Sequence, residues 1–203
     1  MDRHEYWDAV YNNRGQTEVS WFQPRPETSL RLIGATGLGK EAAIIDVGGG
    51  ASLLVDHLLD DGYTDLTVLD VSAKALCLSR ERLGERAARV NWWAEDVTEF
   101  TPPRQYDIWH DRAVFHFLTR KEDRAAYLAA ARAGVRPGGF LIVAAFAPEG
   151  PEQCSGLPVA RYSEEAMARE FAGGFELVET LEEDHRTPAG KIQPFRYCRF
   201  SAR

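Results

Sequence analysis

The sequence predicts an α/β fold with a doubly wound, mostly parallel sheet of seven strands. After residue 42, short runs of β-branched and other apolar residues alternate with helical runs, as in consecutive βα units. The first strand-like run ends at the glycines of residues 48–50, which indicates a tight turn from a strand into a helix. The last two strand-like runs have no helical run between them, which predicts an antiparallel C-terminal edge.

The strands are expected where β-branched and apolar residues cluster between turn signals. The run at 140–146 is the most apolar of them and is typical of a buried strand. A Pro/Gly-rich loop is expected at 148–158, and a second loop at 182–194 joins the last two strands. The seven strands are expected at residues 43–47, 66–70, 89–93, 106–110, 140–146, 175–181 and 195–201.

The helices are expected where apolar residues recur at helical spacing and a cap or a glycine marks an end. Ser72 is placed to cap a helix that ends before Gly84. Thr119 and Glu122 form a capping box for a later, alanine-rich helix that closes at Gly134. The helices are expected at residues 27–34, 52–61, 72–83, 119–134 and 163–173.

The first 40 residues contain no strand-like run, so the chain divides into two parts of a single domain. Residues 1–40 form a helical N-terminal extension, and residues 41–203 form the α/β region. A length of 203 residues supports one domain rather than two, at about 150 residues per domain.

Composition excludes several classes of protein. Apolar residues make up 44% of the chain and charged residues 27%, which is typical of a globular protein. The net charge of −7 argues against nucleic acid as a partner, because phosphate binding requires a basic face. The longest apolar run is too short to cross a membrane, and the three scattered cysteines are expected to be free thiols. We therefore expect a cytoplasmic monomer or weak homodimer.

Three aspartates near the ends of the first three strands indicate a nucleoside-containing ligand. Open α/β sheets bind ligands at the carboxyl ends of their strands. Asp70 is placed to accept both hydroxyls of a ribose, and Asp96 to accept from an adenine amino group, while Asp46 precedes the glycine turn. The dinucleotide-binding fingerprint requires a glycine where Leu53 stands, which disfavours an NAD oxidoreductase.

Five motifs follow one another in a recognisable order, at residues 45–50, 68–72, 95–97, 106–112 and 136–139. They resemble the ordered motifs of class I S-adenosylmethionine-dependent methyltransferases over residues 43–147. The resemblance implies a Rossmann-like fold and S-adenosylmethionine as cofactor, with S-adenosylhomocysteine as product. One departure is Ser52, which stands where the third glycine of the turn is usual.

The N-terminal pattern adds a second resemblance. Residues 6–11 (YWDAVY) and 20–23 (SWFQ) are similar to the lead-in of small bacterial methyltransferases of the thiopurine and tellurite type, and to that of elongation-factor and citrate-synthase lysine methyltransferases. This implies a lid over the cofactor. The cofactor-binding residues that the two resemblances imply are Trp7, Tyr11, Trp21, Asp46, Gly48, Gly49, Gly50, Asp70, Val71, Ser72, Asp96, Val97 and Asp111.

The reacting groups are expected just after the fourth strand, where the resemblance places the transferable methyl group. Methyl transfer from a sulfonium is an in-line displacement, so the protein mainly aligns the reacting atoms and excludes water. His116 is the candidate general base, because a histidine titrates near neutral pH, and Asp111 is the second catalytic candidate. A core position for His116 is an equal alternative. No metal site is expected, since His110 and His116 lack further ligands at suitable spacing. The candidate substrate residues are Phe22, Arg112, Phe115, His116 and His185.

The acceptor class remains open between two alternatives. The small size of the chain and its aromatic N-terminus favour a small-molecule methyltransferase. A protein lysine methyltransferase is the alternative, although His116 stands where the lysine enzymes typically place an acidic residue. A module that binds S-adenosylmethionine without catalysis is the non-enzymatic alternative.

Overall fold

The computed structural model describes residues 2–203 and confirms the predicted α/β fold. The strands of its main sheet are β1 (Ala43–Val47), β2 (Asp65–Asp70), β3 (Val90–Ala94), β4 (Tyr106–Arg112), β5 (Val135–Phe146), β8 (Phe175–Arg186) and β9 (Ile192–Ala202). They lie in the order β3-β2-β1-β4-β5-β9-β8. Among the strands β1 to β5, each neighbouring pair is parallel. Strand β9 is antiparallel to both β5 and β8.

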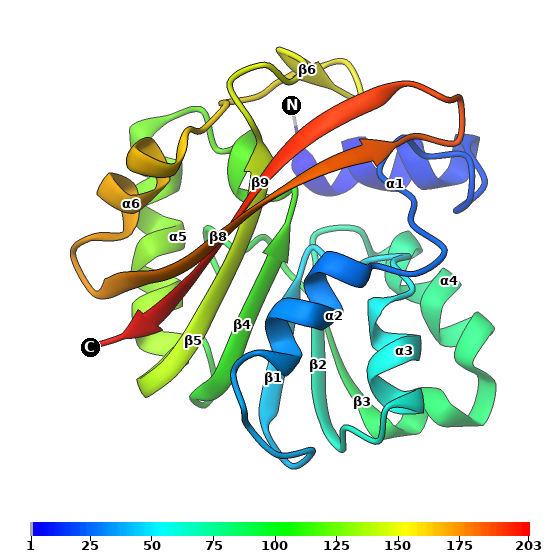
Figure 1. Cartoon of the computed structure of the whole chain (residues 1–203). Coiled ribbons are helices and arrows are strands. Elements are labelled where there is room, and N and C mark those ends of the chain that lie inside the picture. Colours follow the sequence, from blue (N-terminus) through cyan, green and yellow to red (C-terminus); the bar gives the residue numbers. More distant parts are fainter. Residues whose placement is uncertain (1) are drawn as a thin grey trace.

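Helices cover both faces of this sheet (Figure 1). They are α1 (Arg3–Asn13), α2 (Glu27–Gly34), α3 (Leu54–Asp60), α4 (Ala73–Leu83), α5 (Lys121–Gly134) and α6 (Glu164–Phe171), with the short 3₁₀ segments η1 (Gly84–Arg89) and η2 (Phe115–Phe117). A two-stranded ribbon of β6 (Gln153–Cys154) and β7 (Leu157–Pro158) follows β5.

Alternate residues of the parallel strands enter two separate hydrophobic cores, because successive side chains of a strand point to opposite faces. Ile45 and Trp109 pack in the core that holds α5 and α6. Ile44 and Ile108 pack in the core that holds α2, α3 and α4. Both faces of the central strands are therefore covered, which explains why these strands are apolar along their whole length.

The loop between the last two strands is shorter than the predicted residues 182–194. β8 continues to Arg186 and β9 begins at Ile192, so the two strands form one long hairpin in which Asp184 pairs with Pro194. The far half of the hairpin is polar because it reaches beyond the core. His185 there donates from Nε2 to the carbonyl oxygen of Ser20 at 2.7 Å. The outer part of the hairpin, which the local sequence did not indicate as strand, thus contacts the distant N-terminal segment through His185.

Two further expectations differ from the structure. The capping box at Thr119 and Glu122 does not form: α5 begins at Lys121, and Arg120 at its N-cap position makes no side-chain cap. The segment predicted as a loop at 148–158 contains the β6–β7 ribbon. The N-terminal extension is helical as predicted, with α1 preceding the expected helix α2.

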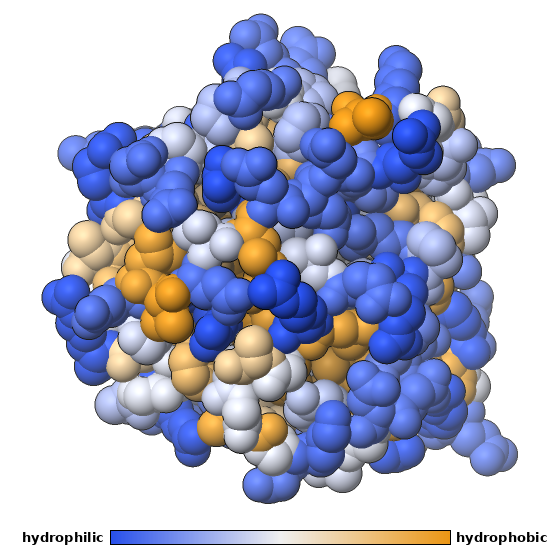
Figure 2. All heavy atoms as spheres, viewed as in Figure 1, coloured by the Kyte–Doolittle hydropathy of each residue, from blue (hydrophilic) through white to orange (hydrophobic). Residues whose placement is uncertain are grey.

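The outer surface gives little sign of an apolar docking face. Figure 2 shows one side of the molecule as mostly hydrophilic, with apolar areas small and separate. Val178 and Ile192 are the large hydrophobic side chains that are exposed among residues 2–203. Within the same residues, none of the helices has the length and hydropathy that crossing a membrane requires.

Candidate active site

The turn after β1 passes very close to neighbouring chain segments. Gly48 has φ of 70°, and a Cβ atom there would lie 2.0 Å from Cγ2 of Val114. Gly50 has φ of 33°, and a Cβ atom there would lie 2.6 Å from Oδ2 of Asp70. Glycine at both positions permits this backbone and its close approach to Val114 and Asp70.

Asp70 lies at the end of β2 with a carboxylate that has few partners. The residue is buried, and its Oδ1 accepts from the backbone N–H of Ser72 at 2.7 Å. Burial raises the pKa of Asp70 to about 7, and the carboxylates of Asp46 and Asp8 act in the same direction. Hydroxyl donors would stabilise the ionised form. This chemistry fits the ribose of a nucleoside.

A cavity of about 150 Å³ opens beside the turn. Asp70, the last residue of β2, and Asp96, which follows β3, line one end of it. Arg112 at the end of β4, together with Phe117 and Cys154, lines the other end. Because β1 lies between β2 and β4, the two ends lie on opposite sides of the glycine turn. We call them the aspartate end and the arginine end.

A smaller cavity of about 40 Å³ adjoins the first. Its lining includes Asp46, Gly49 and Phe22. Tyr11, Trp21, Gly48 and Arg112 line both cavities. The two spaces therefore meet around the glycine turn and the N-terminal aromatic residues.

Helix α1 lies across the cavity and is bonded to three separate elements. Asp8 accepts from the hydroxyl of Ser72 at 2.6 Å and from the backbone N–H of Lys74 at 3.0 Å, which joins α1 to the start of α4. Tyr6 donates its hydroxyl to the carbonyl oxygen of Ser155, beside β6. Trp7 packs edge-on against Phe117, with ring centroids 5.1 Å apart. These contacts hold α1 across the cavity, with Arg3, Trp7 and Tyr11 in its lining.

Residues 20–23 lie over the smaller cavity and are held by the β8–β9 hairpin and β4. Arg112 donates from Nη1 to the carbonyl oxygen of Trp21 at 3.0 Å. Gln23 donates from Nε2 to Glu183 at 2.9 Å, and Glu183 also lies 3.4 Å from Nη2 of Arg112. Sequence analysis missed Glu183, because an acidic residue in a segment expected to be a loop carries no signal of its own.

The structure brings most of the predicted cofactor-binding residues to these cavities. Those that line the larger cavity are Trp7, Tyr11, Trp21, Gly48, Asp70, Val71, Asp96 and Val97. Asp46 and Gly49 line the smaller one. Gly50 and Ser72 lie behind the cavity walls, where Ser72 caps α4 through a hydrogen bond from the N–H of Ala75.

Asp111 and Phe115 do not line either cavity. Asp111 is fully buried and accepts from the backbone N–H of Val114 at 2.9 Å and of Phe115 at 3.1 Å. Burial raises its pKa to about 7. The carboxylate thereby supports the turn after β4. Phe115 packs between Tyr127 and Phe171, at centroid distances of 4.9 Å from each.

His116 and His185 also lie outside the cavity walls, while Arg112 and Phe22 line them as expected. The side chain of His116 is fully buried. Burial lowers the pKa of His116 to about 3, and the charge of Arg112 acts in the same direction. A base with so low a pKa is poorly matched to proton transfer near neutral pH. His185 holds residue Ser20 as described above.

A buried polar chain that the sequence did not reveal supports Asp46. Nδ1 of His110 lies 2.7 Å from Oδ1 of Asp46, and Nε2 of the same ring lies 2.9 Å from Oγ of Ser29. Because a carboxylate accepts, Nδ1 donates to Asp46, while Nε2 and the hydroxyl of Ser29 form the second hydrogen bond. All three residues are buried. His110 thereby ties the end of β1 to β4 and α2.

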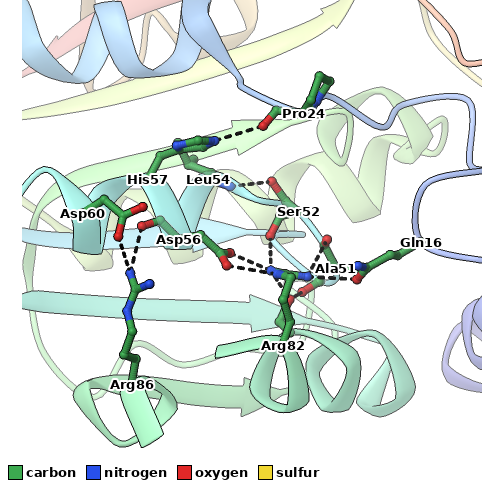
Figure 3. A network of polar contacts seen from close by, with 12 residues as sticks. Gln16, Pro24, Ala51, Ser52, Leu54, Asp56, His57, Asp60, Arg82 and Arg86 are labelled. Carbon is green, nitrogen blue, oxygen red and sulfur yellow. Dashed lines mark hydrogen bonds and ion pairs between the residues drawn. The ribbon is translucent and has the colours of Figure 1, made fainter. Parts of the chain in front are cut away.

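Arg82 on α4 holds carbonyl groups at the end of the glycine turn (Figure 3). It donates to the carbonyl oxygens of Ala51 at 3.2 Å and Ser52 at 2.8 Å. It also pairs with both carboxylate oxygens of Asp56, at 3.0 and 2.7 Å, and reaches Gln16 of the N-terminal segment at 2.9 Å. A lone arginine in an exposed helix pattern gave no sequence signal for this role.

Comparisons with known proteins indicate a methyltransferase domain. A family model described as a methyltransferase domain matches residues 45–141. EEF1A lysine methyltransferase 2 of Danio rerio is 27% identical over 192 residues, covering 87% of this chain and 76% of the relative. The N-terminal Xaa-Pro-Lys N-methyltransferase 1-A of Xenopus laevis is 30% identical over 117 residues, covering 56% of this chain and 51% of the relative.

Solved structures share the fold. A protein studied for the conversion of a disulfide bond into a thioacetal group during echinomycin biosynthesis has a TM-score of 0.78 and 20% identity, covering 98% of this chain and 93% of its own. The N-methyltransferase NodS of Bradyrhizobium japonicum, solved with S-adenosylhomocysteine, has a TM-score of 0.68 and 18% identity, covering 89% of each chain. The chain thus contains a methyltransferase domain, and the matched domain together with the sheet order supports a class I S-adenosylmethionine-dependent methyltransferase.

Proposed function

We propose that this enzyme transfers the methyl group of S-adenosylmethionine to a small-molecule acceptor. The observation that carries the proposal is the lining of the arginine end. Trp21, Phe117 and Leu157 make it apolar, and Arg112 supplies a positive charge. Among the described residues that line the larger cavity, the carboxylates gather at the aspartate end. At the arginine end, an ammonium group would meet Arg112, which pairs with Glu183, and no carboxylate of the cavity lining, so a neutral or anionic acceptor fits better.

The aspartate end would hold the nucleoside part of the cofactor. Asp70 would accept from the ribose hydroxyls, Val71 would pack on the adenine, and Asp96 with Val97 would face its edge. Asp46, Gly48 and Gly49 would lie at the methionine end, in the smaller cavity. Trp7, Tyr11 and Trp21 would cover the bound molecule as parts of the lid. The position of Gly48 in the walls of both cavities and the buried Asp70 carboxylate support this arrangement.

The bound cofactor supplies an electrophilic methyl group on a positively charged sulfur. The acceptor's lone pair forms the new bond to carbon, while the electron pair of the broken carbon–sulfur bond stays with sulfur. The proton of a protic acceptor passes to water. The chain contributes alignment and exclusion of water. α1 and the β6–β7 ribbon, joined through Tyr6 and Ser155, would form the cover.

Protein lysine methylation is the second candidate, and the relatives favour it. The Danio rerio relative, whose name is that of a lysine methyltransferase, aligns over 87% of this chain. A lysine acceptor would have to reach the arginine end as a neutral amine.

An acceptor screen scored by release of S-adenosylhomocysteine separates the two candidates. The panel contains thiols, phenols, carboxylates and N-heteroaromatic compounds, alongside purified elongation factor 1A and a protein lysate. We expect turnover with members of the small-molecule set and background release with the proteins. The Asp70→Ala variant is the control for S-adenosylhomocysteine release that does not depend on the proposed cofactor site. Turnover with protein alone would replace the proposal by the lysine alternative.

A further inference from the structure

His116 occupies an unusual position for a polar side chain. Its ring is enclosed by Phe117, Phe146 and Phe195, at centroid distances of 4.5, 4.7 and 6.5 Å. The residue is fully buried, and neither ring nitrogen has a hydrogen-bond partner among residues 2–203. His110 and His185, the other buried histidines, are both hydrogen-bonded. Buried polar groups without partners cost stability and are rare in native proteins.

The position of His116 relates it to the arginine end of the cavity. Phe117 lines that end, and its ring meets the His116 ring edge-on at an interplanar angle of 85°. Val114 and Leu118, two residues to either side, line the cavity as well. His116 therefore lies directly behind one aromatic side chain of the wall. On the cavity side, Phe117 contacts Trp7 of the lid.

We propose that the ring nitrogens of His116 bind the protic group of the acceptor, which reaches them when the Phe117 side chain rotates. The acceptor would then be a flat apolar molecule, preferably aromatic, that carries a hydroxyl, thiol or N–H group. The inference rests on the proposed small-molecule function. The aromatic lining residues Trp7, Trp21 and Phe117 match an aromatic body, and an unpartnered imidazole matches a single hydrogen-bonding group.

The role differs from general-base catalysis. A neutral imidazole accepts a hydrogen bond from the acceptor and fixes the direction of its lone pair. On transfer, the nucleophilic atom bonds to the methyl carbon, the electron pair of the carbon–sulfur bond stays with sulfur, and the proton passes to water. An amide side chain that offers an acceptor at a similar place should replace part of this contact, whereas an apolar ring should not.

The test uses three variants of His116 and the phenols, thiophenols and N-heteroaromatic compounds that the wild-type chain methylates. His116→Phe fills the aromatic enclosure without a polar atom. We expect kcat/KM for the acceptor to fall by about tenfold or more, because the variant loses at least one buried hydrogen bond to the acceptor. The Kd of S-adenosylhomocysteine should stay within about twofold and the Tm should not fall, because an unpaired polar group is removed.

His116→Gln and His116→Asn keep a polar atom near Nε2 and near Nδ1, respectively. One of them should recover part of the lost kcat/KM. If His116→Phe does not fold, these two variants test whether His116 binds the acceptor. Phe171→Leu, a core change away from both cavities, is the control for the effect of lowered stability alone. Wild-type kcat/KM in all three His116 variants would overturn the inference and leave the proposed function intact. Absence of turnover by the wild-type chain across the small-molecule panel would overturn both.

Discussion

Arg3 joins α1 to the aspartate end of the cavity through Asp96. Its Nη1 donates to Oδ2 of Asp96 at 2.8 Å, and its Nη2 lies 2.5 Å from Oδ2 of Asp123 on α5. Asp96 is the residue proposed to face the adenine. In the proposed arrangement one carboxylate would have two tasks, to hold α1 and to face the cofactor, which predicts that the two are coupled.

The first prediction follows from this pair. Arg3→Ala should loosen α1 and weaken S-adenosylhomocysteine binding by about threefold to tenfold, since a partly exposed ion pair contributes roughly 0–1 kcal/mol and a second contact to Asp123 is also lost. Limited proteolysis within residues 3–13 should become faster, and added cofactor should protect the wild type more than the variant. The exposed pair of Arg120 and Glu122 provides the control, Arg120→Ala. Equal proteolysis with and without ligand in the wild type would mean that α1 is not a lid.

The second prediction concerns the pH dependence of cofactor binding. The pKa of Asp70 is raised to about 7 in the free protein by burial. Donation from ribose hydroxyls favours the ionised form, so the bound pKa is lower than the free one. Affinity should therefore be full above pH 7 and decline as the pH falls below it, with a proton released on binding in that range. Calorimetry in buffers of different ionisation enthalpy measures the release.

Asp70→Asn is the variant that checks the assignment of this titration. The amide cannot titrate, so the affinity should become nearly independent of pH between about 6 and 8. It should also be weaker than that of the wild type by roughly ten- to a hundredfold, because hydrogen bonds to a charged group are lost. An unchanged pH profile in Asp70→Asn would assign the titration to another group.

The third prediction concerns the close approach at Gly48. Gly48→Ala places a Cβ atom in the space of Val114 Cγ2 and strains a backbone with φ of 70°. We expect a loss of about 1–3 kcal/mol of unfolding free energy from the strained conformation and additional loss from the clash. Combining it with Val114→Ala should recover the clash portion alone. Urea unfolding of the two single variants and the double variant tests this.

The fourth prediction concerns Arg82, which touches the turn but not the cavity. Arg82→Met should raise the Kd of S-adenosylhomocysteine by about tenfold, because the carbonyls of residues 51 and 52 lose charged hydrogen bonds of roughly 1.5–3 kcal/mol each in isolation. The rate constant at saturating cofactor should change little. Arg82→Lys should recover only part of the affinity, since a lysine lacks the planar fork. Arg86→Met is the matched control, because Arg86 pairs with Asp60 and does not touch the turn. Equal effects of the two substitutions would assign the change to general helix stability.

The sequence by itself determined the seven strands, the glycine turn and the positions of Asp46, Asp70 and Asp96. These features depend on local signals: apolar runs of strand length, glycines where φ is positive, and side chains at the ends of consecutive parallel strands. Each of these signals involves residues that lie close to one another in the sequence. The family resemblance rested on the same local motifs, and the structure confirmed the fold that it implied.

Only the tertiary structure decided which polar side chains face the cavity and which support it. His116 stands between two phenylalanines in the sequence, and only packing against Phe146 and Phe195 shows that its ring is enclosed. Arg82 contacts the turn 30 residues earlier in the chain. The long β8–β9 hairpin contacts residue 20 across 165 positions. Contacts over such separations depend on the arrangement of whole elements, which no local pattern in the sequence specifies.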